Sequence, residues 1–279
     1  MGADPAIGTR ARWAWARDAV KAKSWAAGLA VSMLLCNFAG AEAWYRWVDA
    51  DGIPHFDRQP PMSATQYELF QVPDPVRWSS PPEIPAEIAA EATITTQNLF
   101  KTTSQSIYRV LGTVKNGLRS ELRAFGSAVA IKEHLAITNC HVIGAAGDVL
   151  SIGASGTEAV ERAELVAVDF IADRCVLGVR EMHLHPVAGI RRYDTLEIGE
   201  TVYAIGNPRS MERTLSNGLV SGKRTIEGAR FLQTTAPISP GSSGGGLFDE
   251  RGNLVAITSM SLRGAQNINF AIPAEDFWK

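Results

Sequence analysis

A short segment near the carboxyl end of the chain places a serine among glycines. Residues 241–245 read Gly-Ser-Ser-Gly-Gly and stand between a proline-containing loop and an apolar strand sequence. Glycine permits a tight turn because it tolerates backbone angles that other residues avoid. Such a turn would expose the Ser243 hydroxyl as a nucleophile and aim the N–H groups of Gly241 and Ser243 at an oxyanion. If residues 241–245 are considered alone, a flexible Gly/Ser loop is the alternative interpretation.

A serine nucleophile needs a base, and histidine is the usual one because its ordinary pKa lies near neutrality. The region after residue 105 contains four histidines, namely His134, His141, His183 and His185. Only His141 directly follows an apolar strand sequence, residues 135–138, which would hold its side chain at the end of a rigid element. We therefore predict that His141 is the base, although a core histidine would fit this residue taken alone.

The base in turn needs a carboxylate to fix its tautomer and to stabilise its charged form. Asp173 stands immediately before the apolar sequence Cys175–Val179, and Asp169 is a competitor four residues earlier. A carboxylate at the start of a strand is held in position, so we predict that Asp173 orients His141.

Residues from about 105 to 279 resemble the trypsin-fold serine proteases of the HtrA/Deg type. Seven segments match that family's pattern in order: FGSAV at 125–129, TNCHV at 138–142, DRCVL at 173–177, AIGNP at 204–208, GLVSG at 218–222, GSSGG at 241–245 and NFAIP at 269–273. The resemblance implies an all-β fold of two six-stranded antiparallel barrels with the active site between them. It also implies a triad of Ser243, His141 and Asp173, with Gly241 and Ser243 forming the oxyanion hole.

Several residues depart from the family pattern. Ser242 replaces the usual Asn or Asp, which should alter how the oxyanion loop is held, and Arg174 replaces an aliphatic residue. Cys140 and Cys175 replace small residues that should be neighbours in the family fold, so the resemblance implies a disulfide between them. Two buried free thiols remain the alternative. The chain ends at Lys279, so no carboxyl-terminal PDZ domain is expected.

The amino terminus has the composition of a secretory signal peptide, expected to span residues 1–43. An apolar run over 25–39 precedes an Ala-Glu-Ala cleavage site at 41–43. The basic residues before that run are Arg10, Arg12, Arg17, Lys21 and Lys23. We expect cleavage after Ala43, a periplasmic or secreted product, and no stable membrane insertion thereafter. An uncleaved membrane anchor is the alternative.

The remaining chain divides into three parts by composition. Residues 44–72 begin with an alternating pattern and an Asp-Gly turn, which predict a small β-hairpin domain. This stretch resembles the start of a small proteobacterial domain of unknown function. The proline-rich residues 73–104 are predicted to be a linker, with a short helix over 84–92. Residues 105–279 are predicted to be the protease domain.

The composition of the whole chain argues against some classes of function. The chain has 279 residues and a formal net charge of −2, without a long basic run, which argues against nucleic acid as a partner. We expect no metal or cofactor, since His55 is a lone histidine without a partner at ligand spacing.

Short apolar segments separated by turns predict many strands after residue 105. The expected strands are 107–114, 125–131, 135–138, 149–152, 163–168, 176–179, 202–205, 219–221, 231–234, 246–248, 254–260 and 268–272. A helical turn is expected to start at Pro273.

Together these features predict an exported serine endopeptidase that acts on polypeptides, with unfolded or damaged envelope proteins as the expected substrates. The segment Ala236–Ile238 carries no acidic residue, so we predict a preference for small or medium apolar side chains at the cleavage site. The alternatives are a non-catalytic binding or chaperone-like module on the same fold, and an esterase.

Overall fold

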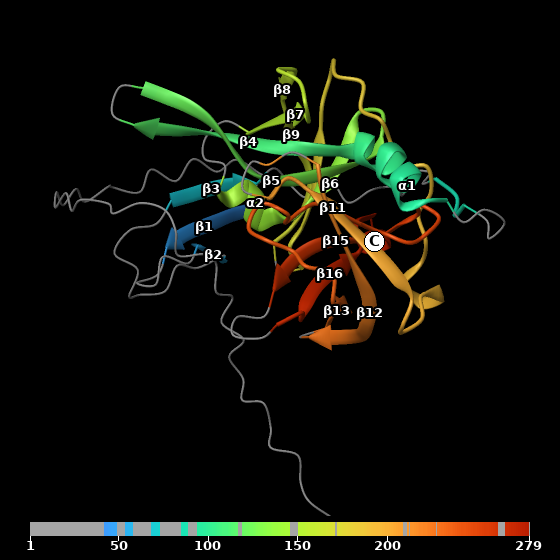
Figure 1. The fold of residues 1–279 in the computed structure, drawn as a ribbon. Coiled ribbons are helices and arrows are strands. Elements are labelled where there is room, and N and C mark those ends of the chain that lie inside the picture. Colours follow the sequence, from blue (N-terminus) through green and yellow to red (C-terminus); the bar gives the residue numbers. More distant parts are fainter. Residues whose placement is uncertain are drawn as a thin grey trace, which may run out of the picture. The chain divides into compact units, whose positions relative to one another are not determined.

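A computed structural model gives the fold of the chain in two compact units, residues 1–71 and 72–279 (Figure 1). It describes residues 42–48, 54–57, 68–72, 85–88, 94–116, 119–145, 150–170, 172–208, 211, 213–226, 228–261 and 266–278. The predicted signal peptide therefore lies almost entirely outside the described residues. Within them, no helix is long and apolar enough to cross a membrane.

The first unit contains a three-stranded sheet. Its strands are β1 (Glu42–Val48), β2 (Pro54–Asp57) and β3 (Glu68–Val72), in the order β2-β1-β3. The antiparallel pairing of β1 with β2 runs from Tyr45 opposite Asp57 to Val48 opposite Pro54. This pair occupies the segment in which the alternating sequence predicts a hairpin, and β3 is a third strand that the pattern did not indicate.

The first barrel of the second unit is a seven-stranded antiparallel sheet. Its strand order is β8-β7-β4-β5-β6-β10-β9. The strands are β4 (Ile107–Asn116), β5 (Arg119–Lys132), β6 (Leu135–Thr138), β7 (Leu150–Ala154), β8 (Val160–Arg162), β9 (Glu164–Asp169) and β10 (Arg174–Gly178). Only Ala163 separates β8 from β9, and its N–H donates to the Leu150 carbonyl over 3.0 Å. The two edge strands of this sheet, β8 and β9, are therefore joined by a single residue, which brings its two edges close together in the chain.

The second barrel is closed directly by strand pairing, in the order β11-β12-β13-β16-β15-β14 (Figure 1, orange to red). Its strands are β11 (Thr201–Gly206), β12 (Thr214–Ile226), β13 (Ala229–Thr234), β14 (Gly246–Phe248), β15 (Leu254–Ser261) and β16 (Asn269–Pro273). Pairing of β14 with β11 completes the ring. The prediction of an all-β fold with two barrels is confirmed, and a 3-10 helix, η4 (Ala274–Trp278), follows Pro273 as expected.

A helix that the sequence did not predict packs against the double barrel. This helix, α1 (Thr96–Thr103), begins after Thr95, whose hydroxyl accepts a hydrogen bond from the Asn98 N–H over 3.3 Å. The Leu99 side chain is fully buried in the same core cluster as Phe248 and Leu254. The segment predicted to be linker up to residue 104 therefore contributes to the core. Residues 85–88, part of the predicted 84–92 helix, are not helical.

Replacement of Leu99 by alanine should destabilise the protein because it leaves a cavity in this core. We expect the free energy of unfolding to fall by about 2–4 kcal/mol, measured by urea denaturation. Gln97→Ala, at an exposed position of the same helix, is the control and should change stability little. Equal stability of the Leu99→Ala and Gln97→Ala proteins would contradict the placement of α1 in the core.

Candidate active site

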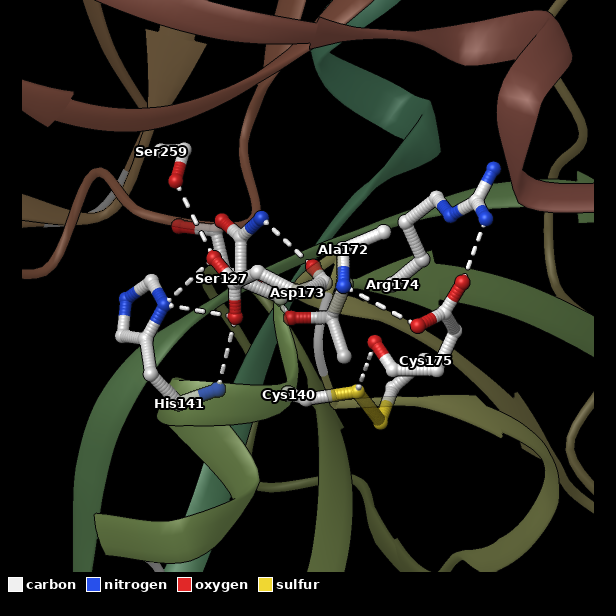
Figure 2. Close-up of a disulfide and its surroundings, with 11 residues drawn as sticks. Ser127, Cys140, His141, Ala172, Asp173, Arg174, Cys175 and Ser259 are labelled. Carbon is white, nitrogen blue, oxygen red and sulfur yellow. Dashed lines mark hydrogen bonds and ion pairs between the residues drawn. A yellow bond between two sulfur atoms is a disulfide. The ribbon is translucent and has the colours of Figure 1, made fainter. Parts of the chain in front are cut away.

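His141 and Asp173 form a hydrogen-bonded pair in the first barrel (Figure 2). The helix α2 (Cys140–Ala145) starts just after β6 and carries His141 in its first turn. The His141 Nδ1 atom lies 2.8 Å from Asp173 Oδ2 and 3.0 Å from Oδ1. The backbone N–H of His141 also donates to Asp173 Oδ1 over 2.9 Å. The carboxylate thus fixes both the imidazole ring and the backbone that carries it.

The strand register explains why these two residues meet. Strands β6 and β10 are antiparallel neighbours, with Cys175 opposite Thr138, so the segment after β6 lies beside the segment before β10. Asp173 adopts a left-handed backbone conformation with φ of 57°, which aspartate tolerates better than most residues. That conformation aims its carboxylate at His141 immediately before the strand begins.

The competing carboxylate, Asp169, has a different set of partners. Its Oδ1 atom accepts a hydrogen bond from the Ala172 N–H over 3.0 Å, and its Oδ2 atom pairs with the Arg174 guanidinium. Arg174 also donates to the backbone carbonyl of Asp276 in η4. Asp169 therefore holds Arg174, which explains a polar residue at this position, while Asp173 contacts His141.

A disulfide between Cys140 and Cys175 lies beside the His141–Asp173 pair (Figure 2). Each cysteine is adjacent or nearly adjacent in sequence to one member of the pair, and both are buried. The bond therefore joins the segment that carries the imidazole to the segment that carries the carboxylate, across a sequence separation of 35.

Ser243 connects to this pair through a residue of the second barrel. Its hydroxyl donates to the backbone carbonyl of Ser259 over 2.9 Å. The Ser259 hydroxyl donates to Asp173 Oδ2 over 3.1 Å, so one residue of β15 contacts both the serine and the carboxylate. The sequence did not single out Ser259, because its role depends on the approach of β15 to a segment 86 residues away.

The turn around Ser243 is pinned to the first barrel through Gly244. The Gly244 N–H donates to Asn139 Oδ1 over 2.8 Å and to the Thr258 carbonyl over 2.8 Å. Asn139 is fully buried, and its side-chain amide donates to the backbone carbonyl of Asp173 over 3.2 Å. A Cβ atom on Gly244 would lie 1.9 Å from the Ser127 carbonyl oxygen, and its φ is 83°. Only glycine fits at this position, which explains why Gly244 follows Ser242 and Ser243 in the sequence.

Two N–H groups of the same turn have no acceptor within the described part of the chain. The N–H of Ser242 donates to the Ser239 carbonyl over 2.8 Å, whereas the N–H groups of Gly241 and Ser243 make no hydrogen bond to described residues. Gly241 has φ of 95°, and its carbonyl accepts a hydrogen bond from the Ser127 hydroxyl over 3.0 Å. Both N–H groups belong to the turn that carries Ser243, and an external acceptor can use them.

The groups available here are a serine hydroxyl, which is linked through Ser259 to the Asp173 carboxylate, and an imidazole oriented by the same carboxylate. Among the described residues, His141 and Asp173 are not part of a three-residue cluster that could hold a metal ion. A hydroxyl, an imidazole held by a carboxylate and free N–H donors are the groups that acyl transfer requires.

Removal of the disulfide should lower stability because it releases a closed loop in the unfolded chain. For a loop of this length, chain entropy predicts a loss of about 3–4 kcal/mol for the Cys140→Ala/Cys175→Ala protein, measured by urea denaturation. Wild type treated with dithiothreitol should lose a similar amount, and the double variant should not respond to the reductant. Equal stability of oxidised and reduced wild type would contradict a bond that constrains these segments.

Comparison with protein families matches residues 126–257 to the trypsin-like peptidase domain. The chain is 36% identical over 168 residues to the serine protease Do-like HtrA of Bacillus subtilis, covering 54% of this chain and 37% of the relative. It is 33% identical over 172 residues to a probable periplasmic serine endoprotease DegP-like of Pseudomonas savastanoi, covering 59% and 35%.

A solved structure described as the HtrA-type protease AlgW with decapeptide is similar to the fold, with a TM-score of 0.60 and 27% identity. The match covers 66% of this chain and 65% of that one. The chain spans little more than a third of the length of the two curated relatives from Bacillus subtilis and Pseudomonas savastanoi.

Proposed function

We propose that this chain, whose residues 126–257 match the trypsin-like peptidase domain and which is similar to HtrA-type proteases, is a serine endopeptidase. Its substrates are polypeptides, and its reaction is hydrolysis through an acyl-enzyme. The observation that carries the proposal is the hydrogen-bond network of Asp173, whose carboxylate accepts from the His141 ring, the His141 backbone and the Ser259 hydroxyl.

In the proposed mechanism, the Ser243 hydroxyl attacks the carbonyl carbon of the scissile peptide bond. His141 takes the hydroxyl proton as the bond between oxygen and carbon forms, and later donates a proton to the leaving amine. Asp173 orients His141 and stabilises its cationic form. The N–H groups of Gly241 and Ser243 bind the oxyanion. Water then attacks the acyl-enzyme and regenerates the Ser243 hydroxyl.

The hydrogen bond from Ser243 to the Ser259 carbonyl has a consequence for substrate binding. A carbonyl beside the nucleophile is an acceptor that a substrate backbone N–H can use, and the Ser243 hydroxyl occupies it in this structure. Substrate binding would displace the hydroxyl from Ser259 and release it for transfer of its proton to His141. The nucleophile would thus be freed by the substrate that it attacks.

The proposed setting is the periplasm, after export by a cleaved signal peptide over residues 1–43. Support comes from the relatives described as periplasmic endoproteases and from the even number of cysteines after residue 43, which an oxidising compartment permits to pair. Polypeptide substrates are supported by the similar structure that contains a decapeptide. Within that setting, unfolded or damaged envelope proteins are the proposed substrates.

Replacement of Ser243 by alanine should abolish proteolysis because it removes the nucleophile. With an unfolded test protein as substrate, we expect the rate of cleavage by Ser243→Ala to fall at least about a thousandfold below wild type, followed by electrophoresis and mass spectrometry. Ser239→Ala is the matched control, since Ser239 is an exposed serine of the same loop, and it should retain most of the activity.

Cleavage that persists in Ser243→Ala would contradict the assignment of the nucleophile. Wild type that binds the unfolded protein without cutting it would instead favour a binding or chaperone-like module. Rapid hydrolysis of small esters, with no cleavage of the corresponding amides, would favour an esterase.

The proposed preference for small or medium apolar side chains can be tested with a peptide library. In the family that the chain resembles, the pocket for the substrate side chain is lined by the segments at residues 236–238 and 258–261, which carry no acidic side chain here. A buried Lys or Arg of the substrate would therefore lack a partner, which is unfavourable. We expect kcat/KM for Val or Ala at the cleavage site to exceed that for Arg at least tenfold. Selective cleavage after Arg would contradict this specificity.

A further inference from the structure

Three side chains suited to metal binding gather at the end of the first barrel that lies opposite His141. Glu133 and His134 form the turn between β5 and β6, and His183 lies in the segment after β10. Strand β6 separates this turn from the α2 helix, a distance of ~13 Å along a four-residue strand. The cluster is thus separate from the proposed catalytic residues.

The spacing of the three groups is close to that of a metal site. One ligand atom from each of Glu133, His134 and His183 lies within 4.8 Å of the others. A tetrahedral zinc ion with bonds of about 2.0–2.1 Å holds its ligand atoms roughly 3.4 Å apart. Glu133 and His183 are exposed, so rotation of their side chains can close the remaining difference.

Backbone hydrogen bonds hold the two contributing segments together without any ion. The Leu184 N–H donates to the Glu133 carbonyl over 2.7 Å, and the Val179 N–H donates to the His134 carbonyl over 3.0 Å. The Glu161 carboxylate accepts the N–H groups of three consecutive residues in the segment between them, Arg180, Glu181 and Met182. The backbone positions of the residues that carry the candidate ligands are therefore fixed by the fold, which reduces the entropy lost on binding.

His134 has a ring nitrogen that the protein does not satisfy. Its Nδ1 atom is buried and makes no hydrogen bond to the described residues. Its ring centre lies 5.1 Å from that of His183. A buried nitrogen without a partner is unfavourable, and a metal bound there would supply one.

A surface ion pair between His183 and Glu133 is the competing explanation of the cluster. Their side chains are 71% and 61% exposed, and exposed pairs contribute little stability. Such a pair accounts for two of the three residues and leaves the His134 nitrogen unexplained.

From these contacts we propose that Glu133, His134 and His183 bind one divalent transition-metal ion of the zinc class, with water as a fourth ligand. Two imidazoles and one carboxylate favour Zn²⁺ or Co²⁺ over Mg²⁺ and Ca²⁺, which prefer oxygen ligands. The bound ion would tie the β5–β6 turn to the segment after β10, at the end of the β6–β10 pair opposite the disulfide.

Equilibrium binding of Zn²⁺ to the purified full chain tests this site. We expect one ion per chain, retained in the presence of excess Mg²⁺, and a rise in Tm of about 5–10 °C at a free concentration near a hundred times Kd. Co²⁺ should bind in its place and give the visible absorption of a tetrahedral complex.

Three variants locate the bound ion. His183→Asn changes an exposed side chain and should weaken Zn²⁺ binding at least tenfold while the Tm of the metal-free protein stays unchanged. His185→Asn is the matched control, because His185 is exposed in the same segment and outside the cluster, and it should bind as wild type does. His141→Ala should also bind normally, which excludes the His141–Asp173 pair as the site.

The absence of stoichiometric Zn²⁺ binding to wild type would overturn the proposal. Equal affinity of wild type and His183→Asn, or loss of binding in His141→Ala, would overturn it as well. None of these outcomes depends on proteolytic activity, so the metal site and the proposed function stand or fall separately.

Discussion

The carboxylate of Asp173 accepts hydrogen bonds from both barrels. From the first barrel it accepts the ring and backbone hydrogen bonds of His141, and from the second barrel it accepts the Ser259 hydroxyl. The backbone of the same residue accepts from Asn139, whose other amide atom holds the turn of Ser243. Displacement of this one residue would therefore disturb the imidazole, the serine turn and the contact between the barrels together.

Other contacts of the first barrel hold the Asp173 segment in position. The antiparallel register of β6 and β10 brings the His141 and Asp173 segments side by side, and the disulfide joins them covalently. Asp169 and Arg174 tie the same region to η4 at the end of the chain. A buried polar network is favourable only when its members are satisfied, and here the hydrogen bonds of Asp173 and Asn139 also fix the positions of His141 and of the turn that carries Ser243.

The sequence predicts much of this fold because strand formation is a local property. The sequence predicts a strand over residues 135–138, and β6 has these bounds, because its apolar residues are flanked by turn residues. The short β8 was missed because Val160–Arg162 alternates for only three residues. The helix α1 was missed because its single fully buried apolar residue, Leu99, gives a weak periodic signal beside a proline-rich segment.

Some residues of the candidate site can be predicted from the local sequence, and others cannot. His141, Asp173 and Ser243 stand out because each lies beside a strand or glycine turn in an ordered pattern. Ser259 lies within a strand, and only its approach to Asp173 reveals what it contacts. The Glu133, His134 and His183 cluster likewise depends on a contact across 50 residues that no local pattern indicates. Contacts between distant segments are set by tertiary packing, and a single sequence does not display them.

The most direct test of the central claim is the reaction of the protein with a fluorophosphonate, which labels a serine only when a base activates it. We expect one label per chain, located at Ser243 by mass spectrometry. In Asp173→Asn, the labelling rate should fall by about three to four orders of magnitude. No labelling of wild type, labelling at another serine, or an unchanged rate in Asp173→Asn would contradict the claim that Asp173 and His141 activate Ser243.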